Sequence, residues 1–269
     1  MRVRAFAVDI DGTLTENGSK VHLQSLSLLR ALERSGYRVL FVSGRSSIEA
    51  YILAMFLGTT RVAIGENGGV ITTSPTEHIL LVERDYSERA YELLRSRLRD
   101  VRLKPVFPRM TEVVLERTFS IDEAMSIVRR EGLPVVIVDS MYAYHINHER
   151  INKAVGLRIA LETLGIKPEE CVAIGDSATD VPLFLSCGYS IAIGNADDGV
   201  KSMAKASVKG RNGNGLLEAL NLVIDNMLDG TGTGTGTDIG MGMGDSSGYS
   251  TGSKDDNEHV GDDGKGVLA

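Results

Sequence analysis

The sequence has little cysteine and no long apolar run, and each absence excludes a class of protein. Its two cysteines, Cys171 and Cys187, form neither a Cys-x-x-Cys pair nor the spacing of a metal site. We therefore expect buried apolar residues rather than a disulfide or a zinc site. No run of roughly 18 apolar residues occurs, which argues against a membrane-spanning helix. The segment after Met1 shows no signal-peptide pattern, so we expect a cytoplasmic protein with no membrane partner.

The sequence also lacks the basic excess that would indicate a nucleic-acid partner. The net charge is −7, and residues 229–269, with eight acidic residues and two lysines, account for most of it. Residues 1–228 hold 28 acidic and 27 basic residues. A nearly neutral body gives no electrostatic reason to expect nucleic acid as a partner. The sequence leaves the oligomeric state, monomer or homodimer, open.

Residues 229–269 form a tail of unusual composition. Twelve of these residues are glycine, and few are apolar. Because such a segment cannot bury enough apolar surface to offset the entropy of ordering, we expect a disordered tail. The tail's Gly-Thr repeat lacks the flanking strand and helix of a phosphate-binding loop, so we do not interpret it as one.

Short apolar runs alternate with helical patterns over most of residues 1–228. The runs are 3–8, 39–42, 62–64, 172–174 and 191–193. Between them, leucines recur at helical spacing and a glycine follows, as in Leu26, Leu29 and Leu32 before Gly36. Buried parallel strands that alternate with helices form doubly wound sheets, whose ligands bind at the carboxyl ends of the strands. We predict an α/β fold with a doubly wound parallel-sheet, Rossmann-like core.

Residues 77–150 interrupt this alternation. Strand-like segments at 79–82, 113–116, 135–138 and 142–146 are interleaved with helical patterns at 87–98 and 120–131. The pattern predicts a smaller α+β cap domain at 77–150, inserted into a core made of 1–76 and 151–228.

Carboxylates gather at the predicted carboxyl ends of the strands. Asp9 and Asp11 follow the first strand in D-I-D-G-T, and Asp176 and Asp180 follow a later strand in G-D-S-A-T-D. Because parallel strands end at one edge of a sheet, these four carboxylates would share a crevice and repel one another. A hard divalent cation relieves that conflict. Oxygen ligands with no His or Cys nearby favour Mg²⁺ over zinc.

These motifs resemble those of the haloacid dehalogenase superfamily of phosphohydrolases. D-I-D-G-T is similar to its first motif, Ser43 in V-S-G-R to its second, Lys153 to its third, and G-D-S-A-T-D to its fourth. The insertion lies where the superfamily's C2 caps lie, and G-E-N-G-G and I-G-N-A resemble segments of Cof-type members. The stretch H-I-N-H-E-R-I-N-K before the third motif is most similar to archaeal phosphoglycolate phosphatases. The resemblance ends near residue 225.

The resemblance implies how the carboxylates work. Asp9 would attack phosphorus and form an aspartyl-phosphate, and Asp11 would serve as general acid and then as general base. Mg²⁺ would be bound by Asp9, by Asp11 through its backbone carbonyl, and by Asp176. Asp180 would be a direct or an outer-shell ligand.

Further residues are candidates for binding substrate. By the same resemblance, Ser43 and Lys153 would hold the non-bridging phosphate oxygens. Asn67 lies in a Gly-rich turn, where a role near the phosphate and a tolerance of positive φ are equally good explanations. His145, on a cap strand, either contacts substrate or packs as a half-buried residue. Arg45 is assigned to structure, because an ion pair or a loop anchor explains it.

The sequence as a whole predicts a Mg²⁺-dependent phosphatase for a small phosphorylated metabolite. A compact cap with Arg109, Arg117 and His145 suits a short anionic leaving group, so 2-phosphoglycolate ranks first. The alternatives are a sugar-phosphate phosphatase or a phosphomutase of the same superfamily. A different class is a non-catalytic, receiver-like Mg²⁺-binding signalling module, against which the insertion and D-x-D-G-T argue.

Overall fold

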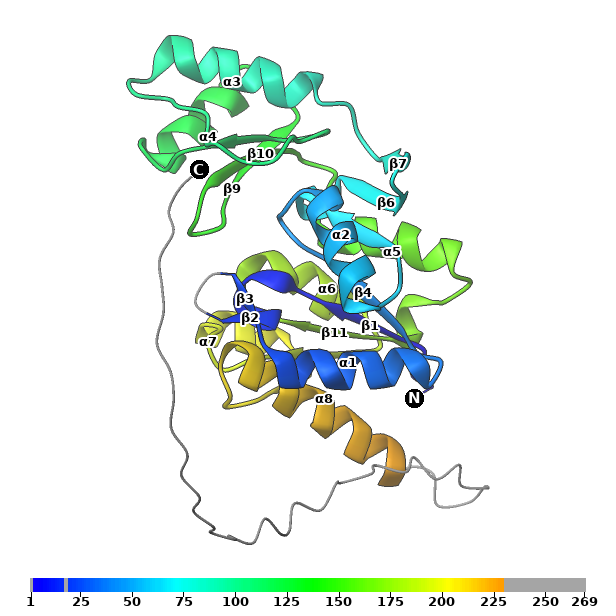
Figure 1. Cartoon of the computed structure of the whole chain (residues 1–269). Helices are drawn as coiled ribbons and strands as arrows, with labels where there is room; N and C mark the ends of the chain where they lie inside the picture. The colour runs from blue at the N-terminus through cyan, green and yellow to red at the C-terminus, as the bar shows by residue number, and fades with distance from the viewer. Residues whose placement is uncertain (1, 17–18, 230–269) are drawn as a thin grey trace, which may run out of the picture. The chain divides into compact units, whose positions relative to one another are not determined.

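The central element of the structure is a five-stranded parallel sheet. In the computed structural model, which describes residues 2–16 and 19–229, the strand order is β13-β12-β11-β1-β4 (Figure 1). The strands are β1 (Ala5–Val8), β4 (Arg38–Phe41), β11 (Cys171–Gly175), β12 (Tyr189–Ala192) and β13 (Ala206–Ser207). Every neighbouring pair among them is parallel. The α/β doubly wound core that the sequence predicts is therefore confirmed.

Helices cover both faces of this sheet, which explains why its strands read as uninterrupted apolar runs. The helices are α1 (Leu23–Arg34), α2 (Ser47–Leu57), α5 (Lys153–Thr163), α6 (Val181–Ser186), α7 (Asp198–Met203) and α8 (Asn212–Asp229). Phe6 and Val8 belong to the hydrophobic core shared with α1, α2 and α8. Ala5 and Ala7 belong to the one shared with α5, α6 and α7. Cys171 is buried on that second face without a disulfide, as predicted.

The chain reverses after the strand that follows β4, so the prediction of a parallel strand at 62–64 is confirmed only in part. The strands concerned are β5 (Ala63–Gly65), β6 (Val70–Ser74) and β7 (Glu77–Leu80), which form an antiparallel sheet. A single parallel bridge between Val42 and Ile64 links β5 to the segment that follows β4. Glu66 and Asn67 both have positive φ, so the turn after β5 is tight and sends the chain straight back. A short hairpin, β2 (Thr15–Glu16) with β3 (Lys20–Val21), follows β1.

A second module has an antiparallel sheet in the order β8-β10-β9. Its elements are α3 (Asp85–Arg97), β8 (Val113–Leu115), α4 (Ile121–Arg130), β9 (Val135–Asp139) and β10 (Tyr144–His148). We call residues 85–148 the cap. The helices α3 and α4 cover one face of its sheet, where Leu115 and Ile146 belong to a separate hydrophobic core (Figure 1). On the opposite face, His145 lies between Val114 and Val138 of the neighbouring strands.

The domain boundaries remain predictions. The strand β7 lies at the start of the predicted insertion, 77–150, but it pairs with β6. The predicted disordered tail, 229–269, lies outside the described residues except for Asp229, which ends α8. Within the described part of the chain, no helix combines the length and the apolar composition needed to cross a membrane.

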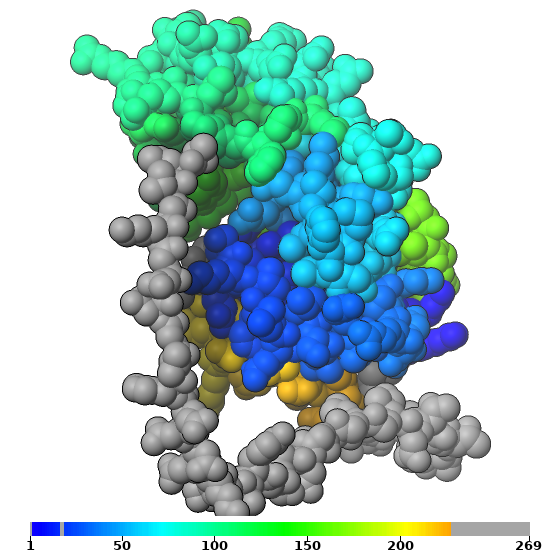
Figure 2. Space-filling model, in the orientation of Figure 1, coloured from blue at the N-terminus to red at the C-terminus, as the bar shows by residue number. Residues whose placement is uncertain are grey.

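The burial of the parallel sheet predicts a large cost for truncating its side chains. Phe41 of β4 is fully buried, whereas Phe56 is 76% exposed on α2, which lies at the surface drawn in blue in Figure 2. We expect Phe41→Ala to lower the free energy of unfolding by about 3–5 kcal/mol. Phe56→Ala should change it by less than about 0.5 kcal/mol. Urea unfolding followed by circular dichroism measures both, and equal losses would contradict the burial of β4.

Candidate active site

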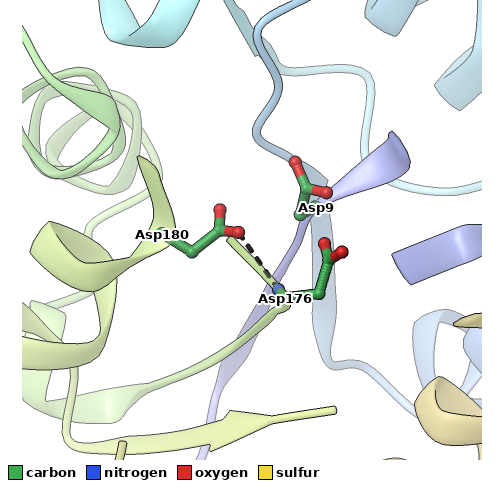
Figure 3. Close-up of side chains that lie close together, drawn as sticks. All are labelled: Asp9, Asp176 and Asp180. Atoms are coloured by element: carbon green, nitrogen blue, oxygen red, sulfur yellow. Dashed lines mark hydrogen bonds between the residues drawn. The ribbon is translucent and has the colours of Figure 1, made fainter. Parts of the chain in front are cut away.

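Three carboxylates meet at the carboxyl ends of β1 and β11. Asp9 directly follows β1, Asp176 directly follows β11, and Asp180 ends the short turn Ala178–Asp180. One carboxylate oxygen of each lies within 4.8 Å of the others (Figure 3). Asp9 and Asp180 are buried, and Asp176 is half-buried. Because β1 and β11 end at the same edge of the sheet, three of the four predicted carboxylates lie together, although Asp9 is far from the other two in the sequence.

Lys153 supplies the positive charge of this cluster. Its Nζ donates to Asp9 Oδ1 at 2.6 Å and to Asp180 Oδ1 at 2.7 Å, and its side chain is buried. The first turn of α5 places it there. Asn152 caps that helix by accepting from the backbone N–H groups of the two residues that follow Lys153. Lys153, the residue of the predicted third motif, therefore forms a hydrogen bond directly with Asp9, the candidate nucleophile.

The charges of the cluster do not balance. Burial raises the pKa of Asp9 well above its ordinary value, against the attraction of Lys153. Burial, followed by the charge of Asp180, raises the pKa of Asp176 to about 6. Burial alone would lower the pKa of Lys153, but the charges of Asp180 and Asp9 outweigh it and raise that pKa. One ammonium faces three carboxylates, and this oxygen donor set fits a hard divalent cation.

The loop after β1 is built around Asp176. Thr13 Oγ1 donates to Asp176 Oδ1 at 2.9 Å. Asn195 Nδ2 donates to Asp176 Oδ2 at 2.5 Å and to the Gly12 carbonyl oxygen at 3.1 Å. Gly12 has φ +83°, and a Cβ there would lie 2.5 Å from Asp176 Oδ2. The contacts of Gly12 and Thr13 with Asp176 thus explain the Gly-Thr pair of D-I-D-G-T. Asn195, in the I-G-N-A segment, was not predicted as a site residue.

Asp180 has both of its oxygens engaged. Oδ2 accepts from the backbone N–H groups of Asp176 and Ser177, at 3.1 and 3.0 Å, and from Ser177 Oγ at 2.9 Å. Oδ1 accepts from Lys153. Asp180 therefore holds the Asp176 loop and the lysine in place at the same time.

Asp11 does not join the cluster of three carboxylates. Arg45 holds its carboxylate in a bidentate pair, Nε to Oδ2 at 2.8 Å and Nη2 to Oδ1 at 2.6 Å. Arg45 also contacts Glu49 at 3.3 Å. Of the two structural roles that the sequence left open for Arg45, an ion pair or a loop anchor, the structure shows an ion pair, and its partner is the predicted acid/base residue. Nothing in the spacing of the two residues indicated this contact.

The predicted substrate-binding residues lie in two connected places, the core loops after β4 and β5 and the cap strand β10. Ser43 lies two residues after the end of β4 and is buried. Its carbonyl oxygen accepts a hydrogen bond from the backbone N–H of Asn67 at 3.2 Å. Asn67 Nδ2 donates to Glu112 Oε2 at 3.4 Å. His145 Nδ1 lies 3.0 Å from the same Glu112 oxygen, and its Nε2 lies 3.1 Å from Ser140 Oγ. Glu112 is fully buried and connects Asn67 of the core to His145 of the cap. The sequence did not predict it as a site residue.

A second buried carboxylate fastens the cap to the core loops. Glu66 accepts from the backbone N–H groups of Met110 and Thr111, at 2.9 and 2.8 Å, and from Thr111 Oγ1 at 2.8 Å. Burial, and then the charge of Glu112, raise the pKa of Glu66. From the cap, Arg109 Nη1 donates to the carbonyl oxygen of Gly44 at 2.8 Å. The loops at 43–45 and 66–67 therefore share their contacts with residues 109–112.

The chain is similar to members of one hydrolase family over most of its length. A family model described as haloacid dehalogenase-like hydrolase matches residues 6–118 and 109–220. A phosphoglycolate phosphatase from Nitrosopumilus maritimus (strain SCM1) is 49% identical over 222 residues, which are 82% of this chain and 96% of that protein. One from Methanosarcina mazei is 32% identical over 227 residues, 84% of this chain and 99% of that protein.

Solved structures share the fold. Thermoplasma acidophilum 0175 superimposes with a TM-score of 0.75 at 23% identity, over 82% of this chain and 98% of that one. A haloacid dehalogenase-like hydrolase from Bacteroides thetaiotaomicron gives a TM-score of 0.68 at 20% identity, over 82% of this chain and 100% of that one.

The unbalanced cluster predicts that a divalent cation stabilises the protein. At a Mg²⁺ concentration of about 100 Kd we expect a gain of about 2.7 kcal/mol, or a rise in Tm of roughly 5–10 °C. Asp176→Asn should abolish most of that rise. A raised carboxyl pKa means that ionisation opposes folding, so at pH 8 this variant should have a higher Tm than the parent when no metal is present.

Calorimetry with and without Mg²⁺ measures these shifts, and Asp122→Asn, at an exposed position of α4, is the control. The same Mg²⁺ response in Asp176→Asn as in the parent would show that Asp176 does not bind the cation.

Proposed function

The chain belongs to the haloacid dehalogenase-like hydrolase family and is a phosphatase, and from this premise we propose that it hydrolyses 2-phosphoglycolate with the help of Mg²⁺. The products are glycolate and inorganic phosphate, and the reaction passes through an aspartyl-phosphate on Asp9. The observation that carries the proposal is the setting of Asp9, whose carboxylate lies 2.6 Å from Lys153 Nζ and within 4.8 Å of the Asp176 and Asp180 oxygens. A nucleophile, its counter-charge and a cation site thus coincide.

Asp9 acts as the nucleophile. Its carboxylate oxygen attacks phosphorus in line, a bond from Asp9 to phosphorus forms, and the bond to the leaving glycolate oxygen breaks. Burial raises the pKa of Asp9, and the positive charge of Lys153 opposes that rise and so favours the ionised nucleophile. Mg²⁺, held by Asp9, Asp176 and the Asp11 backbone carbonyl, would reduce the repulsion between the anionic nucleophile and the anionic phosphate.

Ser43 and Lys153 bind the phosphoryl oxygens. The Ser43 hydroxyl oxygen accepts from the Arg45 backbone N–H at 3.1 Å, so its own proton remains available to a phosphate oxygen. The ammonium of Lys153 lies between Asp9 and Asp180 and stabilises charge on the transferred group. Asp180, with both oxygens engaged, acts by holding Lys153 and the Asp176 loop.

Asp11 moves the protons. It protonates the leaving oxygen in the first step, and in the second it takes a proton from the water that attacks phosphorus and releases Asp9. Arg45 holds the Asp11 carboxylate in a bidentate pair, so this ion pair has to open before Asp11 reaches the leaving oxygen. Arg45 therefore controls the position of the acid/base residue.

The relatives support 2-phosphoglycolate as the substrate. Proteins named phosphoglycolate phosphatase match this chain over almost their whole length. The matched length is therefore enough to include both the residues proposed to act on phosphate and the cap. A receiver-like, non-catalytic module is set aside, because the chain is a phosphatase.

A phosphate-release screen of small phosphomonoesters tests the proposal. With Mg²⁺ and no organic acceptor, we expect kcat/KM for 2-phosphoglycolate to exceed the values for hexose and pentose phosphates by at least about 10-fold. Asp9→Asn keeps the side-chain volume but lacks the nucleophile, so its kcat should fall by at least about 10³-fold.

A higher kcat/KM for a sugar phosphate would overturn the substrate and leave the phosphatase standing. Transfer that requires an organic acceptor would identify a phosphomutase or phosphotransferase instead.

A further inference from the structure

Arg109 of the cap lies against the loop that carries the proposed phosphate ligands. Its Nη1 donates to the carbonyl oxygen of Gly44 at 2.8 Å. Gly44 lies between Ser43, which we assign to a phosphate oxygen, and Arg45, which holds Asp11. A cap cation is therefore fixed against the loop that carries Ser43 and Arg45.

Arg117, the other cap arginine considered from the sequence, is engaged elsewhere. Its Nη2 donates to Asp139 Oδ2 at 2.8 Å, and its Nη1 donates to the Met141 carbonyl oxygen at 3.1 Å. Both partners belong to the cap, and the Arg117 side chain is 37% exposed. The geometry therefore separates two arginines that the sequence could not distinguish.

Arg109 is also incompletely paired. Its side chain is 8% exposed, yet its Nε makes no hydrogen bond to any residue that the structure describes. Glu112 Oε1 lies 3.1 Å from Arg109 Nη1 but is not aligned to accept a hydrogen bond from it. A buried donor without a partner costs about 1–3 kcal/mol. A carboxylate, whose two oxygens match the guanidinium fork, is the acceptor that suits this site best.

Glu112 fixes the position of Arg109. Its other oxygen, Oε2, is held by His145 Nδ1 at 3.0 Å and by Asn67 Nδ2 at 3.4 Å. Glu112 is fully buried, so it cannot turn away to solvent. In this arrangement His145 and Asn67 are positioning residues, which act on substrate through Glu112 and Arg109.

The side chains beside His145 on this face of the cap are apolar or already hydrogen-bonded, an environment unsuited to hydroxyl groups. Val114 and Val138 are its cross-strand neighbours on the same face. Both ring nitrogens of His145 are engaged, by Glu112 and Ser140. Hydroxyl groups brought against this face would lose water without gaining partners.

We propose that Arg109 binds the carboxylate of the leaving group and so selects short phosphomonoesters that carry an acidic group. This role rests on the proposed function and assigns the specificity of that same site. Lys153 and Ser43 bind the phosphate end of the substrate, and Arg109 binds its carboxylate end.

Ethyl phosphate provides the matched comparison, because a methyl group stands where 2-phosphoglycolate has its carboxylate. The quantity measured is the ratio of kcat/KM for 2-phosphoglycolate to kcat/KM for ethyl phosphate, with Mg²⁺ present. We expect Arg109→Met to lower this ratio by at least about 30-fold, as the loss of a charged hydrogen-bonded pair implies. Arg109→Lys should recover part of the ratio, and Arg117→Met should change it by less than about 3-fold.

The outcomes separate the two proposals. If the parent prefers 2-phosphoglycolate but Arg109→Met loses activity equally on both substrates, or not at all, Arg109 does not bind the carboxylate and the proposed function stands. If the parent hydrolyses ethyl phosphate as well as 2-phosphoglycolate, both the substrate and the role of Arg109 are wrong. Melting curves for all variants show whether a loss on both substrates reflects unfolding.

Discussion

The excess of negative charge where β1 and β11 end is the constraint on which the rest of the site depends. Three carboxylates, those of Asp9, Asp176 and Asp180, share this edge with the single ammonium of Lys153. Such a group is tolerated where every oxygen is held and a cation completes the neutralisation. Hydrogen bonds from neighbouring loops hold Asp176 and Asp180 in place. The loops after the strands are therefore shaped by electrostatics, and the sheet brings them together.

The core and the cap have different proposed roles, and their contacts explain how these roles are linked. The loops after β1 and β11 and the first turn of α5 supply the proposed nucleophile, its lysine and the proposed cation site, which would act on a phosphate group whatever it is attached to. The cap supplies Arg109 and Glu112, which lie against Gly44 and Asn67 of the core loops. Glu66, buried in the core, accepts hydrogen bonds from three donor groups of Met110 and Thr111 of the cap. Under the proposed function, selection of the leaving group is thus coupled to the loops that hold the phosphate.

The sequence predicted the parts of the site that depend on strand ends alone. Asp9 and Asp176 lie where strand boundaries put them, and those boundaries can be read from apolar runs. Lys153 was predicted from the family resemblance and not from a boundary. The pairing of Arg45 with Asp11 and the link from Asn67 through Glu112 to His145 could not be predicted, because they join residues whose separation carries no periodic signal. The reversal after β5 was missed because a short apolar run reads the same in a parallel and an antiparallel strand; the positive φ of Glu66 and Asn67 decides it.

The central claim is that Asp9 becomes covalently phosphorylated, and trapping that intermediate tests it most directly. The parent protein is mixed with 2-phosphoglycolate and Mg²⁺, quenched in acid within one turnover, reduced with borohydride and digested for peptide mass spectrometry. We predict reduction of Asp9 to homoserine when substrate is present, none without substrate, and none at this position in Asp9→Asn. Reduction at another carboxylate and none at Asp9, while the protein releases phosphate, would contradict it.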